Sequence, residues 1–123
     1  MSIVVAVAIG GAAGVLSRYG LDALIEQHTE STFPWATFAI NVTGCLVVGF
    51  VIAAVDRHHA PDWLRAELVV GFCGGYTTFS TFAQESLELV EGDRAGLALA
   101  SVTASVVAGV AAVWLGARLG RMA

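Results

Sequence analysis

The segment from Gly71 to Phe82 holds the residue types most able to do chemistry in this chain. Two adjacent glycines, Gly74 and Gly75, precede two adjacent threonines, Thr77 and Thr78, within an apolar stretch. Both residue types are poor helix formers. We therefore expect a helix interrupted near Gly74 to Thr78, where freed carbonyl groups can coordinate a cation and a half-helix N-terminus favours an anion. The alternative is an unbroken helix whose glycines are packing contacts and whose hydroxyls bond to the preceding turn.

Two phenylalanines follow the expected break. Phe79 and Phe82 are three residues apart and so share one helix face, with Ser80 and Thr81 on the flanks. The edge of an aromatic ring is electropositive and can solvate an anion weakly. In an arbitrary membrane helix two such rings more often simply pack, so both interpretations stay open.

Other polar side chains stand alone in apolar surroundings. Asn41 lies within a long apolar run with Thr37 one turn before it, and Ser101 and Ser105 are four residues apart in another. Each of these groups is more often an interhelical hydrogen bond than a transport site. Together they could line a narrow pore with neutral donors and no fixed positive charge.

The composition is that of a membrane protein. Of 123 residues, 57% are hydrophobic and 13% are charged, whereas a soluble domain carries about 25% charged residues. A net charge of −4 and the absence of lysine argue against a nucleic-acid-binding protein. Cys45 and Cys73 lie in apolar runs and are interpreted as small buried hydrophobic residues.

Four apolar runs could each span a bilayer. When they are extended to the ~20 residues that a membrane helix needs, they predict an all-α membrane protein of one domain. The expected spans are about residues 3–25, 34–55, 64–88 and 95–118, with Arg18 near the end of the first. Glycines in the spans predict close helix contacts. Four short helices enclose little volume, so we expect a partner subunit.

Three motifs of the chain resemble one family. They are Gly10-Gly11-Ala12-Ala13-Gly14 with Ser17-Arg18-Tyr19, then Asn41-Val42-Thr43-Gly44, and finally Gly71-Phe72-Cys73-Gly74-Gly75 running into Thr77-Thr78-Phe79-Ser80-Thr81-Phe82. In this order, and over essentially the whole chain, the sequence resembles the Fluc (CrcB) fluoride channels.

The resemblance implies an antiparallel, dual-topology dimer of four-helix subunits in the cell membrane that exports fluoride passively and protects against its toxicity. By position, Asn41 would line the pore and donate to fluoride. Phe79 and Phe82 would present their ring edges along the pathway, flanked by Ser80 and Thr81. Ser101 and Ser105 match a hydroxyl track on the last helix.

The resemblance also implies supporting groups and a structural ion. The backbone carbonyls of Gly74 and Thr77, from both subunits, would hold a sodium ion at the dimer centre. The supporting residues would be Thr78 at the break, Arg18 in a vestibule or tying the helices together, Thr37 beside Asn41, and Glu85 closing the polar track near the end of the third span.

The arginines leave the subunit pairing open. With four spans, the termini share a side with Arg57, Arg65, Arg118 and Arg121, while Arg94 and Arg18 lie toward the other side. The positive-inside rule then favours a cytoplasmic N-terminus. Either this bias is too small to fix one orientation, which gives a homodimer, or the chain forms a heterodimer with an oppositely biased homologous subunit. We favour the homodimer.

Two other functions remain as alternatives. A small four-helix multidrug/proton antiporter would need a carboxylate in mid-membrane, and the first span offers only Asp22 near its end. In a non-transporting scaffold subunit, Asn41 and the hydroxyls would only join helices. An enzyme is not expected, because His28, His58 and His59 lie in predicted loops and do not resemble a metal site.

Overall fold

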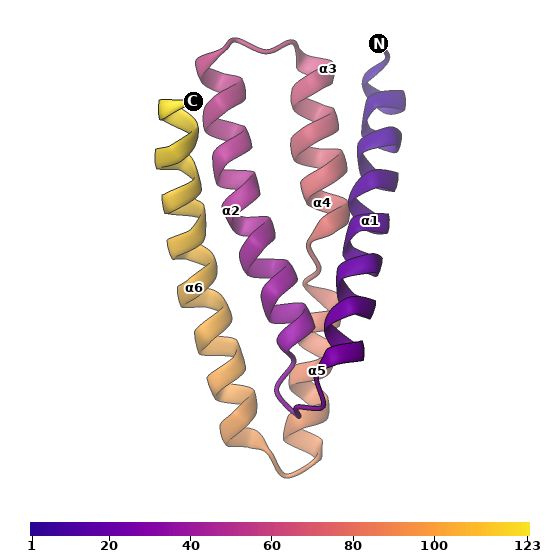
Figure 1. The fold of residues 1–123 in the computed structure, drawn as a ribbon, viewed down its shortest axis with the longest axis vertical. Helices are drawn as coiled ribbons and strands as arrows, with labels where there is room; N and C mark the ends of the chain where they lie inside the picture. The colour runs from indigo at the N-terminus through magenta and orange to yellow at the C-terminus, as the bar shows by residue number, and fades with distance from the viewer.

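The computed structural model describes all 123 residues, and the chain is helical with no strand (Figure 1), which confirms the predicted all-α architecture. Three helices are long and continuous: α1 (Ile3–His28), α2 (Trp35–Arg57) and α6 (Ala95–Met122). Between α2 and α6 the chain crosses once more in four consecutive pieces. They are α3 (Asp62–Arg65), the π-helical segment η1 (Ala66–Cys73), α4 (Gly74–Tyr76) and, after a break, α5 (Ser80–Glu91).

The surface of the molecule is apolar, as a lipid-facing surface must be. Helices α1, α2 and α6 are each long and apolar enough to cross a membrane. Only 18 of the 123 residues are buried, and the exposed side chains include Val4 at 77%, Leu16 at 69% and Val107 at 64%. Soluble monomers do not expose this much apolar surface. The protein is therefore a multi-pass membrane protein.

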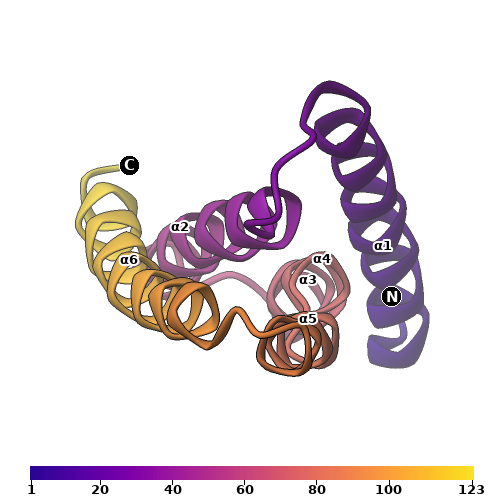
Figure 2. The same cartoon turned by 90° about the horizontal axis from the view of Figure 1, so that it is seen from below.

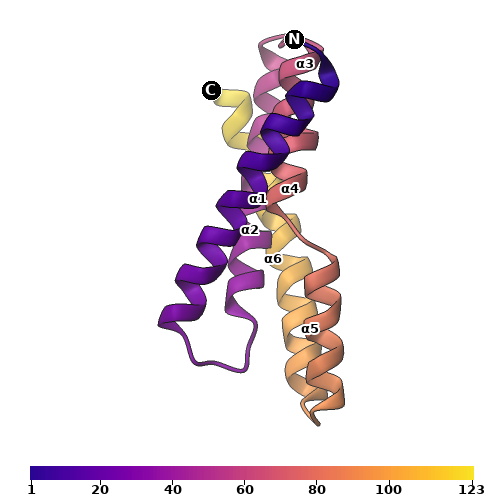
Figure 3. The ribbon, with the colours of Figure 1, turned by 90° about the vertical axis from the view of Figure 1, so that its right-hand side faces the viewer.

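The helices form two packed pairs. Helix α2 runs along α6, and α1 runs along η1 and α4 (Figure 2). After the break, α5 moves away from α1 and packs on α6 instead (Figure 3). The third crossing thus changes its neighbour at the break, and this change joins the two pairs into one bundle.

Glycines allow the backbones of α1 and the third crossing to touch. A Cβ atom on Gly10 would collide with the carbonyl oxygen of Glu67, and one on Gly14 with the carbonyl oxygen of Phe72. Helices in lipid gain no hydrophobic stabilisation from each other, so their association depends on van der Waals contact at such small residues. The predicted role of these glycines in close packing agrees with this geometry.

The break overlaps the region in which the sequence predicts it, Gly74 to Thr78, but the glycine pair is not part of it. Gly74 and Gly75 are helical, and the helix ends only at Tyr76. A Cβ atom on Gly75 would lie 2.8 Å from the carbonyl oxygen of Gly11. Gly75 is therefore required for contact with α1, and the interruption comes later, at residues 77–79.

Both chain termini lie at one end of the bundle, beside the loop between α2 and α3 (Figure 1). The short loops turn on residues in the left-handed region, with φ of 49° at His59 and 60° at Asp93. Histidine and aspartate adopt this conformation more readily than most residues. Arg65 forms an ion pair with Asp56 across the first of these loops.

Replacement of Gly14 by valine should push α1 away from the third crossing. We expect a loss of about 1–3 kcal/mol in unfolding free energy, as is usual for an overpacked contact, measured by denaturation in detergent. Gly20→Val is the matched control, because a Cβ atom there meets nothing within 4 Å. Equal losses in both variants would contradict the proposed contact.

Candidate functional site

The interruption of the third crossing is the centre of the candidate site. The helix stops because Thr77 is extended, with φ −85° and ψ 157°, and helical structure resumes at Ser80. The hydroxyl of Thr77 donates to the carbonyl of Cys73 at 2.9 Å, and the hydroxyl of Thr78 accepts from the N–H of Thr81 at 3.3 Å. The two threonines therefore finish one helix and start the next.

Asn41 supplies the hydrogen bonds that the helix lacks at the break. Its Nδ2 donates to the carbonyl oxygen of Thr78, and its Oδ1 accepts from the N–H of Thr78, both at 2.9 Å. In an unbroken helix that N–H would donate to the carbonyl of Gly74. One N–H of the Asn41 amide remains for a further acceptor.

Arg18 stabilises the same break from the other side. Its Nε donates to the carbonyl oxygen of Gly75 at 3.2 Å. This contact places Arg18 at the level of the break, within α1, which continues to His28. An arginine in a spanning segment is costly unless it is paired. Arg18 ties α1 to the third crossing.

An open groove of about 380 Å³ runs beside the break. It brings together five of the residues that the sequence singled out, namely Asn41, Gly74, Thr77, Thr78 and Phe79. The remaining lining is apolar and includes both cysteines, Cys45 and Cys73. A polar break inside an apolar groove is a setting where a weak donor can still hold a dehydrated ion.

The two phenylalanines contact each other on one side of the break. Their ring centroids are 6.0 Å apart with the planes tilted by 47°. Phe79 is 79% exposed, so it packs on little within its own chain, and Phe82 is half-buried. Ser80 is exposed and Thr81 half-buried beside them. None of Phe82, Ser80 and Thr81 lines the groove.

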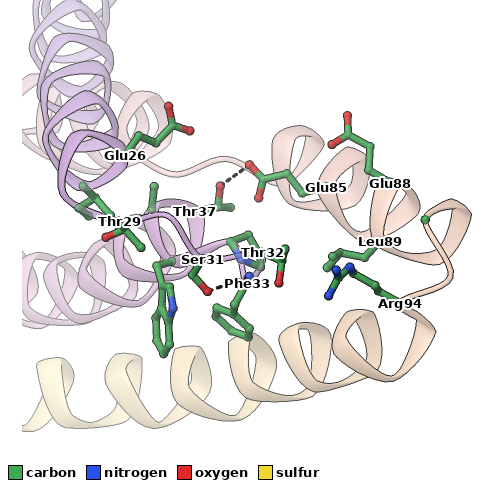
Figure 4. A pocket seen from close by; sticks show the side chains of 15 residues that line it. Glu26, Thr29, Ser31, Thr32, Phe33, Thr37, Glu85, Glu88, Leu89 and Arg94 are labelled. Carbon is green, nitrogen blue, oxygen red and sulfur yellow. Dashed lines mark hydrogen bonds between the residues drawn. The ribbon is translucent and has the colours of Figure 1, made fainter.

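A second polar pair joins α2 to α5. The hydroxyl of Thr37 donates to Glu85 Oε1 at 2.8 Å, while Glu85 Oε2 is buried and has no hydrogen-bond partner. Thr37 therefore supports Glu85 and makes no hydrogen bond to Asn41. The pair lines an open pocket of about 370 Å³ at the end of the bundle away from the termini. Figure 4 shows Glu26, Glu88 and Arg94 around it.

The serines of α6 lie outside both cavities. Ser101 is only 1% exposed, and its hydroxyl has no hydrogen-bond partner. Ser105 is half-buried. A buried hydroxyl without a partner costs free energy in a folded chain. The Ser101 hydroxyl is such a group in the last helix.

Sequence reasoning missed Tyr76. This residue is buried just before the break, and its hydroxyl bonds to that of Thr43 at 2.8 Å. Its ring stacks on Phe72 with centroids 5.9 Å apart. Its position between the glycine pair and the threonine pair was the available signal, because a tyrosine in an apolar span needs a partner for its hydroxyl.

Comparison with known proteins identifies relatives over nearly the whole chain. Residues 5–117 match the family described as CrcB-like protein, Camphor Resistance (CrcB). Proteins named fluoride-specific ion channel FluC are similar to it: that of Acidobacterium capsulatum is 42% identical, covering 93% of this chain and 92% of its own length. That of Azotobacter vinelandii is 40% identical over 94% of each chain. One named FluC 2, from Symbiobacterium thermophilum, is 44% identical over 92% of this chain and 93% of its own.

Replacement of Asn41 by alanine should leave the N–H and the carbonyl of Thr78 without partners. The expected loss is about 1–3 kcal/mol of unfolding free energy, measured by denaturation in detergent. Thr103→Val in α6 serves as the control, because Thr103 is exposed and makes no side-chain hydrogen bond. A variant as stable as the wild type would show that Asn41 does not hold the break.

Proposed function

Because the chain belongs to the CrcB-like family, we propose that it is a fluoride channel, a non-enzymatic membrane protein that lets fluoride leave the cell passively. The observation that carries this proposal within the molecule is the groove at the interrupted helix, where Asn41, Thr78 and Phe79 meet. Non-helical backbone at membrane depth persists only where it is buried in protein or lines a polar path. The location that follows is the cell membrane.

The pathway residues act through weak, neutral interactions. Fluoride is small and strongly hydrated, so it needs close donors when it sheds water, and Asn41 has one amide N–H left after bonding Thr78. The rings of Phe79 and Phe82 can offer their electropositive edges next to it. Because no single contact is strong, a bound ion can leave again, as conduction requires. Ser80, Thr81, Ser101 and Ser105 extend the supply of hydroxyl groups.

A second subunit would complete the path. Phe79 is largely exposed, and the groove beside it is open on one side. We propose an antiparallel dimer that closes the groove, and we favour a homodimer. A heterodimer with a homologous subunit is the alternative. Some relatives carry numbered names, such as FluC 2 in Symbiobacterium thermophilum and FluC 1 in Streptomyces avermitilis, which is compatible with paired subunits.

A sodium ion at the centre of that dimer fits the carbonyl oxygens at the break. The N–H that would normally return to the Gly74 carbonyl is bonded to Asn41, and Thr77 lies outside any helix. Both carbonyls are therefore available as hard oxygen ligands, which suit an alkali or alkaline-earth cation. Two such pairs from two subunits would supply the ligands, and the ion would neutralise their partial charges.

The antiporter alternative is not favoured. It would exchange protons on a carboxylate deep in the membrane, whereas Glu85 lies in the outer part of the third crossing and lines the open pocket at its end. Relatives of the chain are also named as fluoride channels.

Purified protein in liposomes should release fluoride passively, without a proton gradient, and should not release chloride. A fluoride electrode measures this efflux, with a potassium ionophore present to dissipate the membrane potential, and a chloride electrode provides the comparison. Chloride efflux equal to that of fluoride, or fluoride efflux that depends on a proton gradient, would contradict the proposal.

Replacement of Asn41 by aspartate should abolish fluoride efflux. The carboxylate can still accept from the N–H of Thr78 but cannot donate to its carbonyl, and its charge repels the anion. The variant must elute like the wild type in gel filtration for the comparison to hold. Undiminished efflux from a folded variant would show that Asn41 does not line the route.

The homodimer requires the chain to insert in both orientations. Reporters fused to the C-terminus, one active only in the cytoplasm and one only outside it, should both be active at comparable levels. A single orientation would exclude the antiparallel homodimer and leave the pairing of two different subunits.

A further inference from the structure

A separate groove lies between α2 and α6, near the end of the bundle that holds the chain termini. Its volume is about 360 Å³. Its floor is apolar, with Gly49, Ile52, Val113 and Ala117, and two arginines, Arg57 and Arg121, line it at the ends of the two helices. It shares no residue with the groove at the break or with the pocket at the opposite end.

The two helices that form the groove touch through glycine. A Cβ atom on Gly49 would collide with the carbonyl of Val113, and one on Gly116 with the carbonyl of Leu46. Apart from Asp56 and the two arginines, the groove beside this contact is lined by Gly49 and aliphatic side chains, a surface that suits an acyl chain.

The two arginines are not neutralised by the protein. The chain contains one salt bridge, in which Arg65 binds Asp56. Asp56 is the only acidic residue that lines the groove, and this ion pair already occupies it. Arg57 and Arg121 are exposed and have no carboxylate partner. The groove therefore carries uncompensated positive charge.

The charge lies at the depth of lipid headgroups. Arg57 is the last residue of α2, and Arg121 is in the last turn of α6. In the next turns toward the bilayer centre, α6 exposes Trp114, with the guanidinium of Arg118 4.8 Å from the ring centroid. Tryptophan and arginine together are typical of the boundary between headgroups and hydrocarbon. The apolar floor of the groove then lies at acyl-chain depth.

We propose that this groove binds one anionic phospholipid, whose phosphate-bearing headgroup is held by Arg57 and Arg121 and whose acyl chain lies over Gly49, Ile52 and Val113. Planar guanidinium groups bind phosphate through paired hydrogen bonds. A free phosphate ion would use the arginines but not the apolar floor, so the shape of the groove favours a lipid. None of the residues placed in the fluoride pathway takes part.

The test measures which lipid stays bound to the purified wild-type dimer or monomer. Protein extracted from nanodiscs that contain equal amounts of phosphatidylglycerol and phosphatidylcholine is analysed by native mass spectrometry. We expect phosphatidylglycerol to be preferred by about 25-fold, the product of about fivefold for each arginine near the phosphate. The double substitution Arg57→Gln with Arg121→Gln should bring the two lipids close to parity.

A second double substitution, Arg94→Gln with Arg118→Gln, is the matched control. It removes the same number of positive charges as the first double substitution, one far from the groove at Arg94 and one beside it at Arg118. The preference for phosphatidylglycerol should remain. Loss of the preference in this control would assign the effect to general surface charge and overturn the proposal. Millimolar inorganic phosphate should not displace the lipid, and full displacement would indicate a site for free anions instead.

The wild-type measurement can overturn the proposal by itself. Equal retention of the two lipids excludes a specific anionic site, whatever the variants do. If the double variant does not fold, the single substitutions Arg57→Gln and Arg121→Gln serve in its place. Each should lower the preference for phosphatidylglycerol about fivefold. Retention unchanged in both folded single variants would also exclude the assignment.

Discussion

Backbone N–H and carbonyl groups must find partners within the protein wherever a chain crosses hydrocarbon, and this requirement governs the third crossing. Its helix stops at Tyr76 and resumes at Ser80. The side chain of Asn41 bonds both backbone groups of Thr78, and Arg18 bonds the carbonyl of Gly75. Because these partners come from α2 and α1, the interruption can exist only while both helices are in place. The polar groups of the candidate site are therefore also those that hold the fold together.

The break also decides which helices touch. Before it, the third crossing packs on α1 through contacts at Gly10 and Gly14, where the backbones meet. After it, α5 packs on α6. Helices α1 and α6 lie on opposite sides of the bundle, with the third crossing between them (Figure 2). The same interruption thus creates the groove beside Asn41 and connects the two helix pairs.

The sequence predicted the helical membrane fold and an interruption of the third helix, since apolar length and poor helix formers are local signals. The expected region, Gly74 to Thr78, overlaps the observed break at residues 77–79. The sequence did not show that the glycine pair stays helical, because composition does not distinguish a glycine that ends a helix from one that lets a neighbour approach, as Gly75 does at Gly11. The hydrogen bond between Thr37 and Glu85 joins residues 48 positions apart. Sequence periodicity indicates only which nearby residues share a face, so it cannot predict such a pair.

The bonds between Asn41 and Thr78 have a consequence for how the protein is made. The ribosome delivers Asn41 37 residues before Thr78, so the amide enters the membrane before its partner exists. When the third crossing follows, its unpaired backbone groups are stable in lipid only if α2 is still beside it. The second and third crossings should therefore leave the translocation machinery together, as a helical hairpin. Asn41 would then be an assembly determinant as well as a structural one, because the third crossing would depend on this side chain when it enters the membrane.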